Sequence, residues 1–146
     1  MTRLRWYGKQ RMAELNAGAK ANVATAGILL KENIKDSFQT TEPMIGKRGG
    51  VLRAGPGRPV RFRPSKKDEP PALQTRNLKR SIISENDFDR EGPVARVGPM
   101  SVFGGVSIKY ARFLEFGTRK MFARPFMIPA LQRMKRTIAT VLARVR

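Results

Sequence analysis

Few residues in this chain could carry covalent chemistry. The 146 residues include no Cys and no His, which excludes thiol nucleophiles, disulfides, a hydrolytic triad with an imidazole base, and zinc sites of the ordinary type. No convergent carboxylate pair stands out, and the Gly55-Pro56-Gly57 string lacks the strand, Lys and Ser/Thr of a phosphate loop. The composition therefore predicts a protein that is not an enzyme and that uses no cofactor and no catalytic metal.

The charge of the chain points to binding instead. Lys and Arg number 30 against 11 Asp and Glu, a formal net charge of +19. This charge favours an anionic partner, which could be nucleic acid, an acidic protein surface or a membrane face. Simple solubility is the alternative, although a small soluble domain typically needs a net charge of only about 2–8.

Glu115 is the residue best placed for a specific polar contact. It is the last acid of the chain, and cations follow and precede it at Arg112, Arg119, Lys120 and Arg124. We hypothesise that Glu115 pairs with one of them, such as Arg124, across a chain corner or a subunit boundary. The alternative is a solvated surface pair worth about 0–1 kcal/mol.

Aromatic residues crowd the same segment. Phe116 and Phe126 are expected in a packed core, whereas Phe122, which follows Met121 in a basic loop, is expected at an interface. Phe113 completes the group.

Two helices must position these residues. The pattern predicts a short helix over 110–116 that starts at Tyr110 and ends at Gly117, a residue that can turn the chain sharply. Thr118 can then hydrogen-bond the backbone that it leaves. The last helix is expected to begin near Pro125 to Pro129, because proline is tolerated only in the first turn. Its predicted apolar stripe consists of Leu131, Met134, Ile138, Val141, Leu142 and Val145.

The first third of the chain predicts one long helix. Its apolar residues recur every three or four positions, at Met12, Leu15, Ala19, Val23, Ala26, Leu30, Ile34 and Phe38. This stripe is expected in the core, with a special packing face as the alternative. Gly18 and Gly27 each weaken the helix by roughly 1 kcal/mol relative to Ala and permit close approach of another helix.

A loop rich in Pro, Gly and Arg is expected over 43–71. It is either flexible and solvated or, in an assembly, ordered against a neighbour or against DNA. The cations that could contact DNA or a partner are Arg48, Arg53, Arg58, Arg61, Arg63, Lys66 and Lys67.

Short strands are expected between this loop and the corner. Residues 75–82 predict a helical turn with Thr75 as N-cap. Strands at 81–84 and 94–97, joined by a polar link over 85–93, and further strands at 101–103 and 106–108 predict a small antiparallel meander. The fold class is therefore α+β: a long N-terminal helix, a small antiparallel β-sheet, a short helix and a long C-terminal helix, with an extended basic loop.

The length predicts a single domain over 1–146. The basic N-terminus has no apolar run behind it, so no signal peptide is expected. No stretch reaches the roughly 18 apolar residues of a membrane span. A cytoplasm-like compartment is the expectation.

The motifs around the corner resemble a known family. Tyr110-Ala111, Leu114 to Thr118, Ala123 to Phe126 and Pro129 to Leu131 are similar to the signature of the gene-product-ten-like tail-component family of long-tailed bacteriophages. The Leu78-Lys79-Arg80-Ser81-Ile82 run after Thr75 resembles another motif of that family, with Arg76 standing where glycine is common. The resemblance covers roughly 75–131.

The resemblance implies a non-catalytic structural protein of the virion, assembled in the host bacterial cytoplasm and located in the neck at the head–tail junction. Members form rings, commonly of six subunits, that join or complete the tail. Implied partners are further copies of the chain, portal-side adaptor or stopper proteins, and tail terminator or tail-tube proteins. Nonspecific contact with the genomic DNA is a further expectation, and no membrane partner is implied.

The corner residues that would serve as subunit interface under this resemblance are Tyr110, Glu115, Phe116, Gly117, Thr118, Phe122, Arg124, Pro125 and Phe126. The alternative function is a nonspecific nucleic-acid-binding protein. No helix-turn-helix or zinc module is recognisable in the sequence, so DNA contact is expected to depend on salt rather than on base sequence.

Overall fold

The fold is α+β, as the sequence predicted. The computed structural model describes residues 7–38, 65–72 and 76–144. The elements follow one another as α1 (Gly8–Asp36), α2 (Asn77–Ser81), β1 (Ile82–Asp89), β2 (Gly92–Pro99), β3 (Val102–Phe103), β4 (Val106–Ser107), α3 (Tyr110–Phe116) and α4 (Met127–Leu142).

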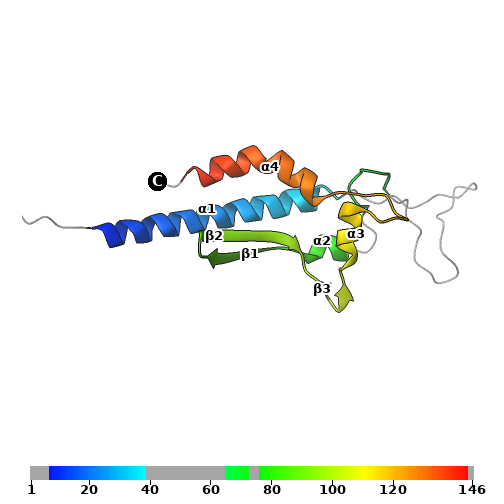
Figure 1. The fold of residues 1–146 in the computed structure, drawn as a ribbon, viewed down its shortest axis with the longest axis horizontal. Coiled ribbons are helices and arrows are strands. Elements are labelled where there is room, and N and C mark those ends of the chain that lie inside the picture. The colour runs from blue at the N-terminus through cyan, green and yellow to red at the C-terminus, as the bar shows by residue number, and fades with distance from the viewer. Residues whose placement is uncertain (1–6, 39–64, 73–75, 145–146) are drawn as a thin grey trace, which may run out of the picture.

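Helix α1 is the central layer. The β1–β2 hairpin packs along one side of α1, and α4 packs along the other (Figure 1). The small core lies where these layers meet near the C-terminal end of α1. It contains Ile34, Phe38, Ile82, Phe126 and Ala130, and the rings of Phe38 and Phe126 stand 5.3 Å apart.

Only the C-terminal half of the predicted α1 stripe is core. Ala26, Ile34 and Phe38 are buried, whereas Met12 and Leu15 are 60% and 44% exposed. The N-terminal part of the stripe is exposed because α1 extends beyond the β1–β2 hairpin and α4 at that end (Figure 1). Apolar side chains at the N-terminal end of α1 are therefore left facing solvent in the single chain.

Gly27 does permit a close approach, but to the hairpin rather than to another helix. A Cβ atom on Gly27 would lie 2.6 Å from Ser84 Oγ and 2.9 Å from Ala95 Cβ. A Cβ atom on Gly18 would meet nothing within 4 Å. The two glycines thus have different roles, and only Gly27 is required by packing.

The hairpin is longer than the sequence suggested. The predicted polar link over 85–93 was wrong, because most of it continues the two strands. Ile82 pairs with Pro99 and Asp89 with Gly92, so only Arg90 and Glu91 form the turn. Gly92 makes this turn possible with φ of +130°. Polar residues can extend a strand when one of its faces meets solvent.

The predicted meander was also wrong. Two separate two-stranded sheets are present among the described residues, one of β1 and β2 and one of β3 and β4. The second is a minimal ribbon in which Val102 pairs with Ser107 and Phe103 with Val106. Gly104 and Gly105 both take positive φ to close it.

The cap of α2 differs from the expectation. Thr75 lies outside the described residues, and Arg76 is the N-cap, with φ of +60° and no side-chain capping bond. The left-handed conformation at Arg76 is one that glycine adopts without cost. This is the position at which the resembling family commonly has glycine.

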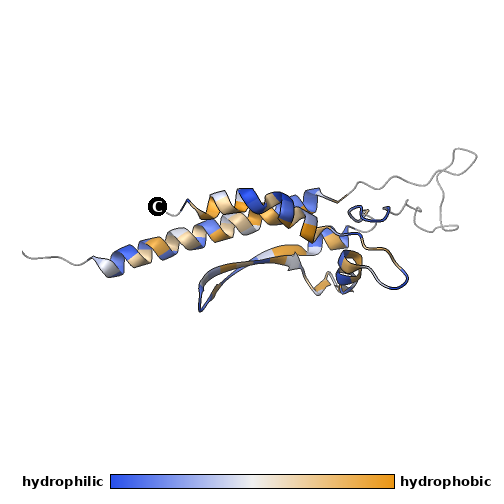
Figure 2. Ribbon diagram, turned by 45° about the horizontal axis from the view of Figure 1, so that its top comes forward, coloured by the Kyte–Doolittle hydropathy of each residue, from blue (hydrophilic) through white to orange (hydrophobic). Residues whose placement is uncertain are grey.

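The apolar stripe of α4 is only partly covered. Ala130 is its buried residue, while Leu131 and Leu142 are 51% and 40% exposed. Met134, Ile138 and Val141 are half-buried, and Val145 lies outside the described residues. Figure 2 shows hydrophobic and hydrophilic residues side by side along α4.

Candidate functional site

The corner between α3 and α4 is organised by Glu115. This residue lies in the last turn of α3 and is only 7% exposed. Its Oε2 accepts hydrogen bonds from the backbone N–H of Phe126 at 2.9 Å and of Met127 at 3.1 Å. Its Oε1 accepts one from the N–H of Ile128 at 2.9 Å. A side chain of one helix therefore caps the start of the next.

This cap accounts for the whole first turn of α4. A helix begins with four N–H groups that have no intrahelical partner. Glu115 accepts three of them, and the fourth position is Pro129, which has no N–H. No acid lies in the first turn of α4 itself, so the carboxylate of Glu115 also supplies the negative charge that a helix N-terminus favours.

The hypothesis that Glu115 pairs with a cation across the corner of its own chain was wrong, whereas a pair across a subunit boundary stays a prediction that one chain does not test. None of the ion pairs among the described residues involves Glu115. Arg124 contributes its backbone instead, because its N–H donates to the Leu114 carbonyl at 2.7 Å. Its side-chain Nε is buried without a partner in the described structure.

Gly117 makes the sharp bend after α3, as predicted. Its φ is +73° and its ψ is −179°, a region that is essentially reserved for glycine. A Cβ atom there would lie 2.9 Å from Ala123 N and 3.0 Å from Met121 O, both backbone atoms that cannot move independently. The corner is therefore closed to any other residue type without rearrangement.

Hydrogen bonds stiffen the loop that follows. Thr118 N donates to Met121 O at 2.8 Å, and Met121 N returns a bond to Thr118 O at 3.2 Å. The Thr118 hydroxyl accepts the N–H of Lys120 at 3.3 Å, which confirms that this side chain bonds the local backbone. The loop between α3 and α4 is thus a tight turn tied at both ends.

The end of the predicted basic loop packs against this turn. Asp68 N donates to the Ala123 carbonyl at 3.1 Å, and the Lys67 ammonium stands 5.6 Å from the centroid of the Phe122 ring. Lys66 and Lys67 are exposed. The remaining candidate contact residues, Arg48, Arg53, Arg58, Arg61 and Arg63, lie outside the described residues.

The phenylalanines of the corner divide differently from the prediction. Phe126 is buried as expected, at 1% exposure, but Phe116 was wrongly expected in the core and is 68% exposed. Phe116 is the last residue of α3, where the chain already turns away from the core. Phe122 is also 68% exposed and Phe113 is 51% exposed. Phe113, Phe116 and Phe122 therefore leave apolar surface exposed on the corner.

The remaining corner residues have supporting positions. Tyr110 begins α3 and is 37% exposed, and partial burial raises the pKa of its phenol. Pro125 is half-buried and directly precedes the capped residue Phe126. These residues shape the corner.

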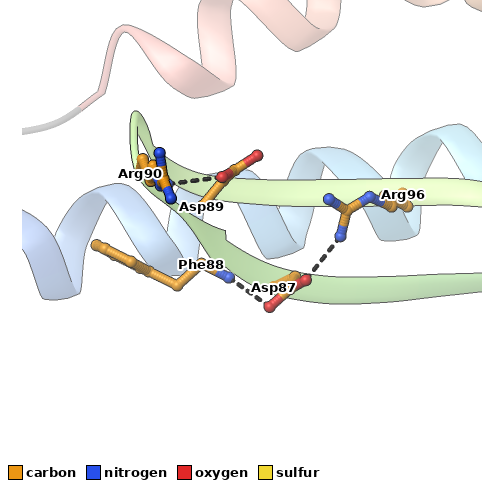
Figure 3. Close-up of polar contacts among 5 residues, drawn as sticks. All are labelled: Asp87, Phe88, Asp89, Arg90 and Arg96. Atoms are coloured by element: carbon orange, nitrogen blue, oxygen red, sulfur yellow. Dashed lines mark hydrogen bonds and ion pairs between the residues drawn. The ribbon is translucent and has the colours of Figure 1, made fainter.

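An acidic surface on the hairpin was missed. Glu85, Asp87, Asp89 and Glu91 are all exposed in a chain that is otherwise strongly basic. The spacing of two between Glu85, Asp87 and Asp89 is the signal that could have placed them on one face of a strand, whereas Glu91 lies in the turn. In Figure 3, Asp87 and Arg96 meet across the two strands, with Asp87 Oδ2 2.7 Å from Arg96 Nη1. The hydrogen bond from Arg96 lowers the pKa of the Asp87 carboxyl.

Over residues 7–38, 65–72 and 76–144, no cluster of three or more acidic, His or Cys residues could hold a metal ion. Within the same ranges no helix combines the length and the apolar character needed to cross a membrane. No protein-family model, curated protein or solved structure matches the chain. The function is therefore argued from the geometry of the corner and from the surfaces that the fold leaves uncovered.

Proposed function

We propose that the chain is a structural subunit of a tailed-phage neck, which assembles into a ring that joins or completes the tail. The observation that carries this proposal is the Glu115 cap. It fixes the direction in which α4 leaves α3 with three hydrogen bonds. Identical subunits close a ring only if each contact repeats the same rotation, and a fixed corner provides that repeat.

The uncovered apolar residues support a role in assembly. Among the described residues, large apolar side chains remain exposed along α1, on the corner and along α4, including Met12, Ile28, Phe116, Phe122 and Leu131. Exposed apolar side chains of this size are the material from which subunit interfaces are built. The core that the chain builds alone is small, which suits a subunit whose neighbours complete its burial.

The partners follow from the same proposal. Further copies of the chain form the ring, and six is the copy number to test first. The two ends of the ring contact a portal-side adaptor or stopper and a tail terminator or tail-tube protein. The genomic DNA contacts cations of the ring through its phosphates alone. No catalytic step, cofactor or membrane contact belongs to this function.

Native mass measurement at moderate salt tests the proposal. After nuclease treatment, the purified chain should give one discrete oligomer, and added tail-tube protein should give capped tubes. A monomer that ignores tail proteins would contradict the proposal.

Nonspecific nucleic-acid binding is the second candidate function. It is favoured by the Lys67 ammonium, 5.6 Å from the centroid of the exposed Phe122 ring, and by the exposed cations Lys66, Arg119 and Lys120, which are close to Lys67 or Phe122 in sequence. Such a surface would bind phosphates with a steep salt dependence. A monomer that shifts DNA, without any ring, is the result that would favour it.

A further inference from the structure

The β1–β2 hairpin has one covered face and one open face. Successive side chains of a strand point to opposite faces. Ser84 and Ala95 face α1, where they meet the backbone of Gly27. The alternate residues Ile83, Glu85 and Asp87 therefore lie on the outer face, where Glu85 and Asp87 are exposed and Ile83 is half-buried.

The outer face contains a groove at the base of the hairpin. The groove has a volume of about 380 Å³ and is lined by residues that include Ile83, Glu85, Arg96, Gly98 and Met100. Met100 is 41% exposed beside it. Farther along the hairpin, the outer face is acidic. Phe88, which alternates with these acids, is 59% exposed near the tip (Figure 3). The face thus combines apolar contacts with negative charge.

The charge of the hairpin is opposite to that of the rest of the chain. Residues 82–99 hold four acids and two arginines, a net charge of −2, whereas the whole chain carries +19. Residues 127–144, which contain α4, hold four cations and no acid, a net charge of +4. Copies of such a basic chain repel one another unless regions of opposite charge meet.

The outer side of α4 matches the hairpin in chemistry and in length. Ile128 and Leu131 are 46% and 51% exposed, and Lys135 and Arg136 are exposed next to them. The 16 residues of α4 span about 24 Å and the eight residues of β1 span about 26 Å. The exposed side of α4 and the outer face of the hairpin thus both present apolar and charged groups, over similar lengths.

Within one molecule α1 lies between most of the hairpin and α4 (Figure 1), and α4 approaches the hairpin only at its start, where a Cβ atom on Gly98 would lie 3.7 Å from Met127 Cε. We propose that the outer face of the β1–β2 hairpin binds the exposed side of α4 from a second copy of the chain. The contact uses two different surfaces, so each copy keeps one free surface for the next copy, and the chain of contacts closes into a ring when the rotation fits. This inference deepens the proposed function and rests on its premise that copies of the chain assemble.

A charge-swap experiment tests the contact. The hairpin variant carries Glu85→Lys and Asp89→Lys, and the helix variant carries Lys135→Glu and Arg136→Glu; all four positions are exposed. A control variant carries Glu14→Lys and Lys9→Glu, on the exposed N-terminal part of α1. Native mass and light scattering report assembly of each protein alone and of equimolar mixtures. Circular dichroism and thermal melting report whether each variant is folded.

Each swapped variant alone should lose assembly. In the hairpin variant both surfaces are basic, with +2 for residues 82–99 and +4 for residues 127–144. In the helix variant residues 127–144 become neutral, and the new acids at positions 135 and 136 face an acidic hairpin. The mixture should regain assembly, because the basic hairpin of one variant meets the acids at positions 135 and 136 of the other, and the acidic hairpin of the second meets the unchanged basic α4 of the first. The control variant should assemble like the unmodified chain. Recovery on mixing is a readout that a merely unfolded variant cannot produce.

The outcomes separate the contact from the function. If the unmodified chain assembles and both swapped variants assemble equally well alone, the hairpin–α4 contact is wrong while the ring remains. If folded variants fail alone and also fail when mixed, the contact is wrong too. If the unmodified chain stays monomeric, or assembles only while nucleic acid is present, both the contact and the proposed function are overturned.

Discussion

Glu115 and Pro129 together complete the N-terminus of α4, although 13 residues separate Glu115 from the last N–H that it accepts. Glu115 accepts the N–H groups of Phe126, Met127 and Ile128, and Pro129 stands at the next position, where no N–H exists. Neither residue alone would satisfy the helix start. Together they hold α3 and α4 at one angle without a conventional N-cap side chain.

Replacing Glu115 with Gln should weaken this corner. The amide keeps one acceptor oxygen but turns an NH₂ group toward backbone donors, so at least one charge-assisted hydrogen bond is lost in a buried position. We expect the free energy of unfolding to fall by about 1.5–3 kcal/mol. Thermal unfolding measures this as a lower melting temperature, by about 2–4 °C for each kcal/mol.

Glu14→Gln is the matched control for Glu115→Gln. Glu14 is exposed and pairs only with the exposed Arg11, at 3.3 Å. Its replacement should change stability by less than about 0.5 kcal/mol. Equal melting temperatures for Glu115→Gln and the unmodified chain would mean that the cap does not hold the corner.

Gly117→Ala should be more costly than the same change at another positive-φ glycine. Both the φ, ψ region and the backbone of Ala123 and Met121 oppose a Cβ atom at Gly117. Gly104 also has positive φ, but a Cβ there meets nothing within 4 Å. We expect Gly104→Ala to cost about 1 kcal/mol and Gly117→Ala to cost at least about 2 kcal/mol. Denaturant unfolding measures the free energy of unfolding of both variants. A larger loss for Gly104→Ala than for Gly117→Ala would contradict this prediction.

The sequence predicted the corner well because its signals are local. Gly117 marks the end of α3, and Pro125 and Pro129 mark the start of α4, through backbone rules that act within a few residues. The partner of Glu115 could not be predicted in this way. Sequence neighbours suggested a cation, whereas the fold brings three N–H groups to the carboxylate from more than ten positions away.

Gly27→Ala and Gly18→Ala should change stability in opposite directions. Alanine at Gly18 meets open space and gains helix propensity, so the chain should be stabilised by up to about 1 kcal/mol. At Gly27 the same gain is outweighed by overpacking against Ser84 and Ala95, which typically costs about 1–3 kcal/mol. Melting of the two variants side by side checks this, and stabilisation by both would show that α1 and the hairpin are not in close contact.

Asp87 should give the hairpin a small pH dependence. The bond from Arg96 lowers the pKa of Asp87 in the folded chain below its ordinary value of 3.8. Stability from this pair is therefore fully present above the ordinary pKa and is lost as the pH falls through the lower, folded pKa. Asp87→Asn should melt below the unmodified chain at pH 7, and the difference should shrink toward pH 2. A difference that stays constant with pH would contradict this origin.

The hairpin shows where local signals fail. The parts of β1 and β2 next to the turn, residues 85–89 and 92–93, are rich in acids, proline and glycine. These residue types favour turns. Tertiary packing overrides that preference, because Gly27 lets α1 pack closely against the β1–β2 hairpin. The exposure of Phe116 was equally hidden, since a phenylalanine at the end of a short helix carries no sign of which way the chain turns next.

Electron cryomicroscopy of the neck in virions that carry this chain tests the central claim most directly. The account predicts a symmetric ring between capsid and tail, in which every subunit shows the same angle between α3 and α4. The account would be contradicted if no density for the chain were found between capsid and tail, or if the angle between α3 and α4 varied from one subunit to the next.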